Sequence, residues 1–357
     1  MKNLRKIFYK KKIIITGHTG FKGSWLSLWL SKMGADVLGI SDNIKTQPSI
    51  FKVCKLEKRI KHSILDIRKF KKLKKKIESF KPDFIFHLAA QALVKKSYEF
   101  PLLTWQTNTL GTLNLLEVLR KYNKKCTVIL ITSDKAYKNL EIKRGYHEND
   151  ILAGIDPYSA SKSSADIAIQ SYINSYFKDQ SKIKISIARA GNVIGGGDWS
   201  VDRLLPDCVK SWSKSRKVFI RNPNSTRPWQ HVLEALMGYL FLAFALNKDS
   251  RIQGEAFNFG PNYKKNYSVL DVIKIFKLKW KNASWILKSS NKFFESNLLK
   301  LNCNKAKKKL KYKSILSFKQ TVSLTAEWYK EYYRKKVNMY DFSVSQINEY
   351  EKILKIK

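Results

Sequence analysis

Short apolar runs alternate with amphipathic stretches through the first half of the chain. The apolar runs predict strands at residues 13–16, 36–41, 84–89, 127–132 and 183–190. The stretches that separate them include three with the spacing typical of helices, at residues 23–33, 104–121 and 160–177. Strands that alternate with helices form βαβ units, in which a parallel sheet carries helices on both faces. The pattern therefore predicts an α/β fold with a doubly wound parallel sheet.

The regular pattern loosens after residue 190. Loops rich in Gly, Pro, Asp and Asn follow, and residues 267–357 have a mostly helical and strongly basic pattern. We expect a nucleotide-binding domain made of residues 1–190 together with about 220–262. A smaller, mixed α/β substrate domain is expected from about 191–219 together with 263–357.

Length and composition limit the class of protein. The 357 residues suit two domains around a cleft. No segment approaches the roughly 18 apolar residues of a membrane span, and the basic N-terminus leads into a short apolar run that ends at Thr16 rather than a signal peptide. The four cysteines have no CxxC spacing, so neither a zinc site nor a disulfide framework is indicated. These features predict a cytoplasmic protein with no metal and no membrane partner.

The net charge of +41 raises the alternative of a nucleic-acid-binding protein. However, the excess is mostly Lys rather than Arg, and it is spread along the chain. Dense runs at residues 69–76 and 305–309 are typical of solvated helix faces. We therefore favour a bias of the source genome toward Lys, Asn and Ile codons and expect no nucleic-acid partner. A basic surface still favours an anionic substrate.

A glycine-rich loop follows the first predicted strand and opens the first predicted helix. Its Gly17, Gly20 and Gly23 have GxxGxxG spacing, with Phe21 and Lys22 between the last two. Such glycines permit a tight turn and close approach of a pyrophosphate, which the N-terminus of the helix attracts. The loop predicts a Rossmann-type dinucleotide site, and a turn without a ligand is the alternative.

An acidic residue follows the second predicted strand. Asp42 lies 19 residues after Gly23, near the distance of about 20 at which a carboxylate binds the adenosine ribose. Its charge would repel a 2′-phosphate, so NAD is favoured over NADP, although Lys45 weakens that exclusion. The alternative is that Asp42 caps a loop.

Tyr158 and Lys162 are spaced to share one face of a helix. A phenol with a pKa near 10 is a weak base at neutral pH. We expect the Lys162 ammonium and a nicotinamide ring to lower the pKa of Tyr158, which would then take a proton from a substrate hydroxyl.

Polar residues also follow the strand predicted at 127–132. Ser133, Asp134 and Lys135 come at its carboxyl end, which faces the cofactor in such sheets. Ser133 is a candidate hydrogen-bond donor to the substrate hydroxyl, and Asp134 with Lys135 is a candidate acid–base pair. A solvent-exposed turn is the alternative.

These motifs together resemble a known family. The strings GHTGFKGSWL, FHLAAQ, TSDKAY, DPYSASK, RAGNVIGGGDW, DRLLPD and RPWQHVLE are similar to the nucleotide-sugar branch of the extended short-chain dehydrogenases/reductases. Within that branch they are most similar to the CDP-glucose 4,6-dehydratase group. The resemblance extends from about residue 12 to about residue 260.

The resemblance implies a lyase that contains NAD. The sugar is oxidised at C4 while Tyr158 takes the O4 proton, water leaves from C5 and C6, and hydride returns to C6. The product, CDP-4-dehydro-6-deoxy-D-glucose, would supply deoxysugars for surface polysaccharide such as O-antigen. The family also implies a homodimer that pairs the helices predicted at 104–121 and 160–177.

Further roles come from the resemblance alone. Asp66 and Ile67 resemble residues that flank the adenine, and Leu88, Ala89, Ala90 and Gln91 resemble the loop under the cofactor. The implied substrate contacts are Asn192, Arg203 and Arg227. His231 is either structural or ligand-binding, and Trp199 and Trp229 are interpreted as core residues rather than stacking platforms.

One position departs from the wider dehydratase pattern. Related dTDP-sugar enzymes have Asp-Glu where this chain has Asp134 and Lys135, and that Glu is the base at C5. Here Lys135 would need a lowered pKa to act as the base. Another nucleotide-sugar dehydratase and a 4-epimerase are the alternative enzymes. The epimerase needs neither a C5 base nor an O6 acid, so the triplet argues against it.

Overall fold

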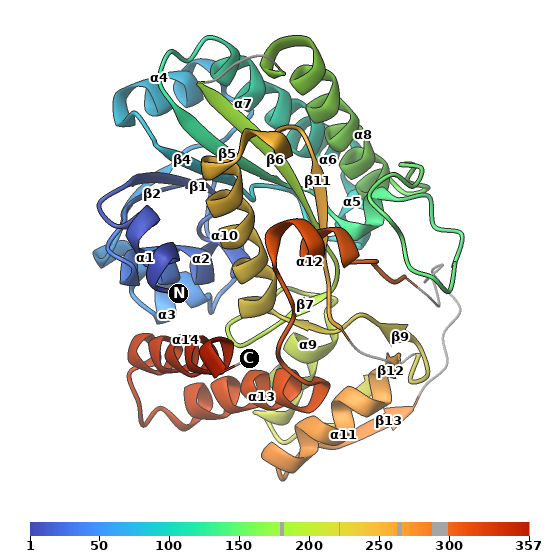
Figure 1. Cartoon of the computed structure of the whole chain (residues 1–357). Coiled ribbons are helices and arrows are strands. Elements are labelled where there is room, and N and C mark those ends of the chain that lie inside the picture. The colour runs from blue at the N-terminus through green and yellow to red at the C-terminus, as the bar shows by residue number, and fades with distance from the viewer. Residues whose placement is uncertain (179–181, 221, 263–265, 288–298, 357) are drawn as a thin grey trace.

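A seven-stranded sheet forms the centre of the protein (Figure 1). The computed structural model describes residues 1–178, 182–220, 222–262, 266–287 and 299–356. The strand order is β11-β6-β5-β4-β1-β2-β3, and every neighbouring pair is parallel. The strands are β1 (Lys12–Thr16), β2 (Asp36–Ser41), β3 (Lys61–Ile64), β4 (Phe84–His87), β5 (Cys126–Ile131), β6 (Ile183–Ala190) and β11 (Ala256–Phe259). The predicted doubly wound parallel sheet is confirmed.

Helices cover both faces of the sheet, and the alternation of side chains along the strands explains how. Ile13 and Ile15 of β1 pack in one core cluster with α2 (Phe21–Lys32) and α10 (Val232–Lys248). Ile14 points to the other face and packs with residues of α4 (Phe70–Phe80), α7 (Gly111–Arg120) and α8 (Pro157–Tyr172). Because both faces are buried, the strands are continuous apolar runs.

Two predicted helices contain π-helical turns. The helix expected at 104–121 consists of α6 (Pro101–Trp105), a π-helical turn over Gln106–Leu110, and α7. The helix expected at 160–177 begins earlier, with Pro157 in its first turn and a capping box formed by Asp156 and Ser159. It ends in a π-helical turn over Ile173–Phe177. These insertions leave the apolar spacing nearly unchanged, so the sequence pattern does not show them.

Two strands of the sheet were absent from the predicted pattern. β3 is a short edge strand with the sequence KHSI, in which no residue is fully buried. β11 pairs with β6 at the opposite edge and has only four residues. The exposed edge position removes the apolar signal from β3, whereas β11 is buried and is too short to give a clear one.

The remaining elements lie outside the central sheet. The short strands are β7 (Val193–Ile194), β8 (Val218–Ile220), β9 (Thr226–Arg227), β10 (Gln230–His231), β12 (Tyr267–Ser268) and β13 (Trp285–Leu287). The further helices are α1 (Lys2–Phe8), α3 (Ile50–Val53), α5 (Val94–Glu99), α9 (Leu204–Trp212), α11 (Val269–Lys279), α12 (Asn304–Leu310), α13 (Phe318–Arg334) and α14 (Met339–Ile356). Short 3-10 turns occupy Leu56–Lys58, Asp134–Ala136 and Ser250–Ile252. The mostly helical pattern expected after residue 267 is confirmed for the described residues.

The C-terminal helices close one side of the molecule (Figure 1). α13 packs against α14, and α14 contacts α2 beside the central sheet. Trp29 of α2 donates a hydrogen bond to Glu351 of α14 at 2.8 Å. The last part of the chain therefore contacts the nucleotide-binding part directly, and the proposed domain division stays a prediction.

Two global findings concern membranes and metals. Among the described residues, no helix is both long enough and apolar enough to span a bilayer. Within the same ranges, no cluster of His, Cys, Asp and Glu is arranged to hold a metal ion. All four cysteines are free, and three of them are buried.

Candidate active site

The glycine loop lies between β1 and α2, at the point where the strand order reverses direction. Gly17 has a φ of +77°, and a Cβ there would lie 2.8 Å from the backbone nitrogen of Ala89. A Cβ on Gly23 would lie 2.1 Å from the carbonyl oxygen of Gly17. Gly20 is the N-cap of α2, and no side chain of this residue caps the first N–H groups of the helix. The loop therefore has the shape and dipole needed for a pyrophosphate.

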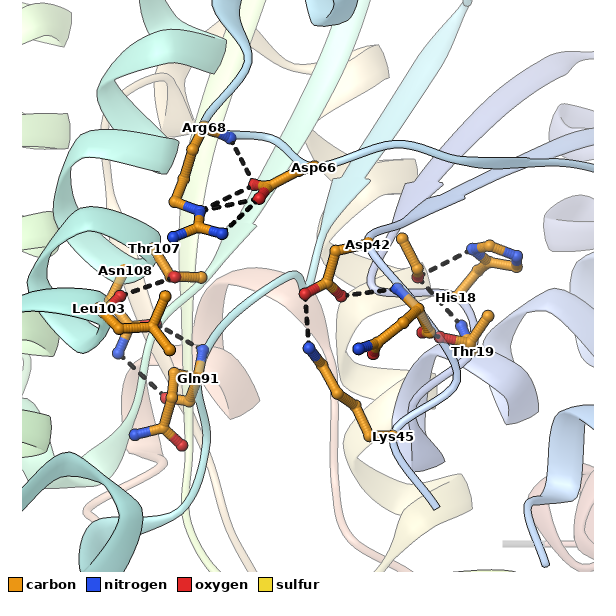
Figure 2. A network of polar contacts seen from close by, with 12 residues as sticks. His18, Thr19, Asp42, Lys45, Asp66, Arg68, Gln91, Leu103, Thr107 and Asn108 are labelled. Carbon is orange, nitrogen blue, oxygen red and sulfur yellow. Dashed lines mark hydrogen bonds and ion pairs between the residues drawn. The ribbon is translucent and has the colours of Figure 1, made fainter. Parts of the chain in front are cut away.

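The side of the loop near β2 and β3 contains two carboxylates, each beside a cation (Figure 2). Asp42 forms an ion pair with Lys45, and both side chains are more than a third exposed. Asp66 accepts hydrogen bonds from the Arg68 guanidinium, one of them at 2.9 Å. Burial works to raise the pKa of Asp66, but hydrogen bonds from Arg68 outweigh it and hold the pKa below its usual value.

The segment after β4 is fixed by hydrogen bonds. The backbone nitrogen of Ala89 donates to Thr16 Oγ1 at 3.2 Å. Gln91 donates its backbone N–H to Asn108 Oδ1 at 2.8 Å, and Asn108 Nδ2 donates to the Gln91 carbonyl at 3.1 Å (Figure 2). Asn108 Nδ2 also lies 2.9 Å from Ser161 Oγ of α8. These bonds hold residues 88–91 between the glycine loop and α8.

Ile67 is placed differently from its neighbour Asp66. Its side chain is buried, and a Cβ on Gly111 would lie 2.6 Å from it. Its carbonyl accepts a hydrogen bond from Asn114 Nδ2 at 3.0 Å. In this structure Ile67 therefore packs α7 against the sheet.

Tyr158 and Ser133 meet above the carboxyl end of β5. Tyr158 Oη is 3.5 Å from Ser133 Oγ, which donates to Asp134 Oδ1 at 3.1 Å. The pKa of Tyr158 is raised by burial, which outweighs the hydrogen bond with Ser133 and the charge of Arg203. Among the groups of the protein itself, burial disfavours the phenolate more strongly than Arg203 favours it, and a lowering of the pKa by the nicotinamide ring stays a prediction.

Lys162 and Lys22 bring two amines into the same region. Burial and the charge of Lys22 together lower the pKa of Lys162 to about 7, against the opposing charge of Asp166. Burial also lowers the pKa of Lys22 to about 8, assisted by Arg203 and opposed by Asp134. Lys22 Nζ lies 3.4 Å from Tyr239 Oη. Both amines therefore have pKa values near neutral pH.

Asp134 is buried beside these groups. Burial raises the pKa of the Asp134 carboxyl, against the opposing charges of Lys135 and Lys22. A Cβ on Gly191 would lie 2.5 Å from Asp134 Oδ2, so the start of the loop after β6 contacts this carboxyl. Lys135 is partly exposed. The triplet 133–135 is thus a structured end of β5 rather than a solvent-exposed turn.

The three substrate-contact candidates lie on the loops after β6. Asn192 accepts a backbone hydrogen bond from Gln230 at 3.1 Å, and its side chain is partly exposed. Arg203 donates to Asp198 Oδ2 at 3.3 Å and acts electrostatically on Tyr158 and Lys22. Arg227 lies in β9, where it donates to the Thr226 carbonyl at 2.8 Å. The charge of Arg203 therefore acts on the Tyr158 region.

His231, Trp199 and Trp229, each a candidate for either a structural or a ligand-binding role, lie in the core. His231 is buried and caps α10 by accepting from the Leu233 backbone nitrogen at 3.3 Å. Burial lowers the pKa of His231 to about 3, so its imidazole is neutral. Trp199 and Trp229 are also buried in the main core cluster. The structural interpretation therefore holds for all three.

The sequence reasoning missed two charged residues behind the site. Arg189 lies at the end of β6 and forms a fully buried ion pair with Asp166 of α8. An Arg within the apolar run of β6 was the available signal, because buried charges require a partner. Asp166, four residues after Lys162, gave no signal of its own.

Comparison with known proteins places these features in a family. The family model for GDP-mannose 4,6 dehydratase matches residues 14–325. Among curated proteins, a CDP-glucose 4,6-dehydratase of Salmonella typhimurium is 43% identical over 329 residues, which cover 91% of this chain and 92% of that protein. The resemblance inferred from the motifs is confirmed.

Solved structures share the fold at lower identity. A UDP-glucose 4-epimerase of Thermotoga maritima has a TM-score of 0.78 at 24% identity, covering 90% of this chain and 99% of that chain. A dTDP-glucose 4,6-dehydratase of Streptomyces venezuelae, solved with NAD bound, has a TM-score of 0.76 at 20% identity, covering 90% and 97%. With the family model and the 43% identical relative, these matches show that the chain belongs to the GDP-mannose 4,6-dehydratase family.

Proposed function

We propose that this chain is an NAD-dependent CDP-glucose 4,6-dehydratase, which converts CDP-D-glucose to CDP-4-dehydro-6-deoxy-D-glucose and water. The observation that carries the proposal is the group of half-buried Tyr158 with buried Ser133 and Asp134 at the end of β5, with Lys135 beside it. The relative that is 43% identical over nearly the whole chain supports the choice of substrate.

The residues around the glycine loop fit a dinucleotide. The close approaches at Gly17 and Gly23 leave no room for side chains, and the N-terminus of α2 beside them has no side-chain cap from Gly20. Bound NAD would accept hydride from C4 of the sugar and return it to C6, so the cofactor is unchanged after each turnover. Asp42 and Asp66 would hold its adenosine half, the loop at Gly17, Gly20, Phe21, Lys22 and Gly23 its pyrophosphate, and Leu88–Gln91 the adjoining surface.

Tyr158 is the proposed acceptor of the O4 proton. Its raised pKa means that the phenolate needs support at the moment of transfer. Arg203 provides positive charge beside it, and Lys162 lies one helical turn further along α8. Ser133 Oγ at 3.5 Å is placed to orient the same substrate hydroxyl. Tyr158 can accept the O4 proton only as the phenolate, so positive charge has to stabilise the phenolate before the transfer.

Asp134 and Lys135 are the proposed acid and base of the elimination. A buried carboxyl with a raised pKa retains its proton closer to neutral pH, so Asp134 suits protonation of the departing O6. Lys135 in its neutral form would remove the C5 proton, which the neighbouring C4 ketone acidifies. A 4-epimerase would need neither group.

The substrate would lie across the loops after β6. Arg203 is the proposed cation for the diphosphate, because a guanidinium binds phosphate oxygens in pairs, with Arg227 and Asn192 as further contacts. In the proposed arrangement the cofactor lies at the glycine loop and the substrate lies at the loops after β6, both at the carboxyl edge of the sheet. It also agrees with the basic composition of the chain.

A homodimer is proposed from exposed apolar side chains on the helices beside the sheet. Leu102, Trp105 and Leu110 of the α6–α7 run and Ile167 of α8 are exposed large hydrophobic residues. Such a group is typical of an interface. Light scattering should give a mass twice that of one chain, and a Leu102→Asp variant should give the mass of a single chain.

A cytoplasmic location and a role in deoxysugar supply for surface polysaccharide remain part of the proposal.

The proposal is tested by incubating purified protein with CDP-glucose and, in parallel, with dTDP-, UDP- and GDP-sugars. Each reaction is run with and without added NAD. Formation of the 4-keto product is followed by its absorbance in alkali and by loss of water in the mass spectrum. Preferred turnover of CDP-glucose supports the proposal, and turnover of another sugar nucleotide alone contradicts the choice of substrate.

A further inference from the structure

A buried ion pair lies directly behind the proposed catalytic residues. Arg189 of β6 donates from Nε to Asp166 Oδ2 at 2.8 Å and from Nη2 to Asp166 Oδ1 at 2.7 Å. The two side chains are only 1% and 0% exposed. Removing two charges from water is unfavourable, and a buried pair is often no more stable than apolar residues of equal volume. Its position therefore needs an explanation other than stability.

Asp166 joins α8 to the end of β5. Its Oδ2 also accepts from Thr132 Oγ1 at 2.9 Å, and its Oδ1 accepts from Gln170 Nε2 at 2.7 Å. Four donors therefore hold one carboxylate in a single orientation. Thr132 is the residue immediately before the triplet Ser133–Lys135, so Asp166 fixes where that triplet begins.

Arg189 joins the same point to the segment that follows the triplet. Its Nη1 donates to Tyr137 Oη at 2.8 Å and to the Glu148 carbonyl at 2.8 Å. Tyr137 Oη in turn donates to Asn258 Oδ1 of β11 at 2.8 Å. The triplet is thus held on both sides, through Thr132 before it and Tyr137 after it.

Asp166 also lies one helical turn beyond Lys162. Of the charged groups that act on Lys162, Lys22 of α2 is a cation and Asp166 is the anion that favours the ammonium. His87 of β4 faces Lys162 and is neutral, because burial and the charge of Lys162 lower its pKa to about 3. Tyr158, one turn earlier on α8, has a raised pKa and is also neutral near pH 7. Asp166 therefore balances the charge of Lys162.

We propose that Asp166 and Arg189 are positioning residues of the reaction. They hold Ser133–Lys135 in register with Tyr158, and Asp166 supplies the counter-charge of Lys162. The inference rests on the proposed function for its effect on turnover, but its effect on Lys162 does not depend on which sugar is the substrate.

The test uses three variants of the full chain. Asp166→Asn combined with Arg189→Met removes both charges and leaves no unpaired one. Asp166→Glu keeps the negative charge and displaces it by one methylene. Thr132→Val removes the bond to β5 and leaves the ion pair intact. For each variant, the affinity for NADH is measured by its fluorescence from pH 5 to 9, and kcat and KM are measured with CDP-glucose.

The wild-type affinity should change near pH 7, and Lys162→Met should abolish that change while Lys22→Met should not. In the charge-free double variant the change should move about one pH unit lower, because the ammonium has lost its counter-charge. In Asp166→Glu the pH at which the NADH affinity changes should stay near its wild-type value. Its kcat should fall about 100-fold, since small displacements of catalytic groups have effects of this order. Thr132→Val should lower kcat and leave the pH at which the NADH affinity changes where it is in the wild type.

An unmoved pH dependence in the double variant would overturn the counter-charge role. An unchanged kcat in both Asp166→Glu and Thr132→Val would overturn the positioning role, even if the double variant did not fold. Absence of turnover in every protein, together with a shifted NADH profile in the double variant, would reject the proposed substrate and retain the role of Asp166.

Discussion

The two ends of the cofactor site use charge in different ways. Near β2, the ion pair of Asp42 with Lys45 is exposed, with 40% and 51% of the side chains accessible. Near β5 and β6, the pair of Asp166 with Arg189 is almost completely inaccessible. Water weakens an exposed pair to a fraction of a kcal/mol, whereas a buried pair tolerates no loss of a partner. Recognition of the adenosine half should therefore tolerate change, and the catalytic half should not.

The largest expected effect is at Tyr158. Tyr158→Phe removes the proposed proton acceptor and a single 3.5 Å hydrogen bond, so the fold should persist. Turnover of CDP-glucose should fall by about 100- to 10,000-fold. Steady-state kinetics with a circular-dichroism melting curve measures both, and Tyr98→Phe, at an exposed tyrosine, is the control. A Phe variant that retained more than about a tenth of the activity would remove Tyr158 from the mechanism.

A more selective effect is expected at Lys135. Lys135→Met should block removal of the C5 proton while leaving oxidation at C4 possible, because Tyr158 and Lys162 remain. The dehydrated product should decrease about 100-fold, and absorbance of reduced nicotinamide should accumulate when CDP-glucose is added. Lys138→Met, three residues further along, serves as the control. Undiminished dehydration in the Lys135 variant would contradict the proposed base.

Buried imidazoles should make the core sensitive to acid. Burial lowers the pKa values of His87 and His231 to about 3, below the usual value of 6.5 for histidine. Between those values the unfolded chain binds more protons, so the free energy of unfolding should fall as pH decreases from about 6.5. Each histidine contributes a slope of at most about 1.4 kcal/mol per pH unit.

Denaturant unfolding at a series of pH values measures that slope. His231→Asn keeps a side chain suited to the N-cap of α10 and removes one imidazole, so the slope should decrease. His147→Asn, at an exposed position, should leave the slope unchanged. Equal slopes in the wild type and the His231 variant would show that His231 does not contribute.

The smallest effect is expected at the adenosine end. Asp42→Ala should change the free energy of unfolding by less than about 0.5 kcal/mol, because the residue is exposed. It should also release Lys45 for a 2′-phosphate and raise the affinity for NADP relative to NAD several-fold. Calorimetric titration with both dinucleotides measures the ratio. The control is Asp249→Ala, which disrupts the exposed ion pair with Arg251 and should leave the ratio of the two affinities unchanged.

The same contrast explains what the sequence could predict. The inner strands were evident because burial on both faces requires apolar runs, and the glycine loop was evident from the spacing of its glycines. The end of β6 was predicted at the correct residue. β3 was missed because an edge strand needs no apolar run. The π-helical turns were missed because they change the hydrogen bonding of the backbone more than its apolar spacing.

The catalytic candidates followed from motifs, but their electrostatics did not. Spacing placed Tyr158 and Lys162 on one helix face, whereas the raised pKa of Tyr158 depends on burial that the whole fold creates. The pairing of Arg189 with Asp166 joins a strand to a helix 23 residues earlier. No local pattern specifies such a partner, since it depends on how α8 packs against the sheet.

The central claim is that the buried end of the site oxidises C4, eliminates water and returns the same hydride to C6. The most direct test is a reaction of CDP-glucose labelled with deuterium at C4, followed by mass spectrometry and NMR of the product. The account predicts loss of water with the deuterium retained and located at C6. Loss of the label to solvent, or a product that kept its oxygen at C6, would contradict it.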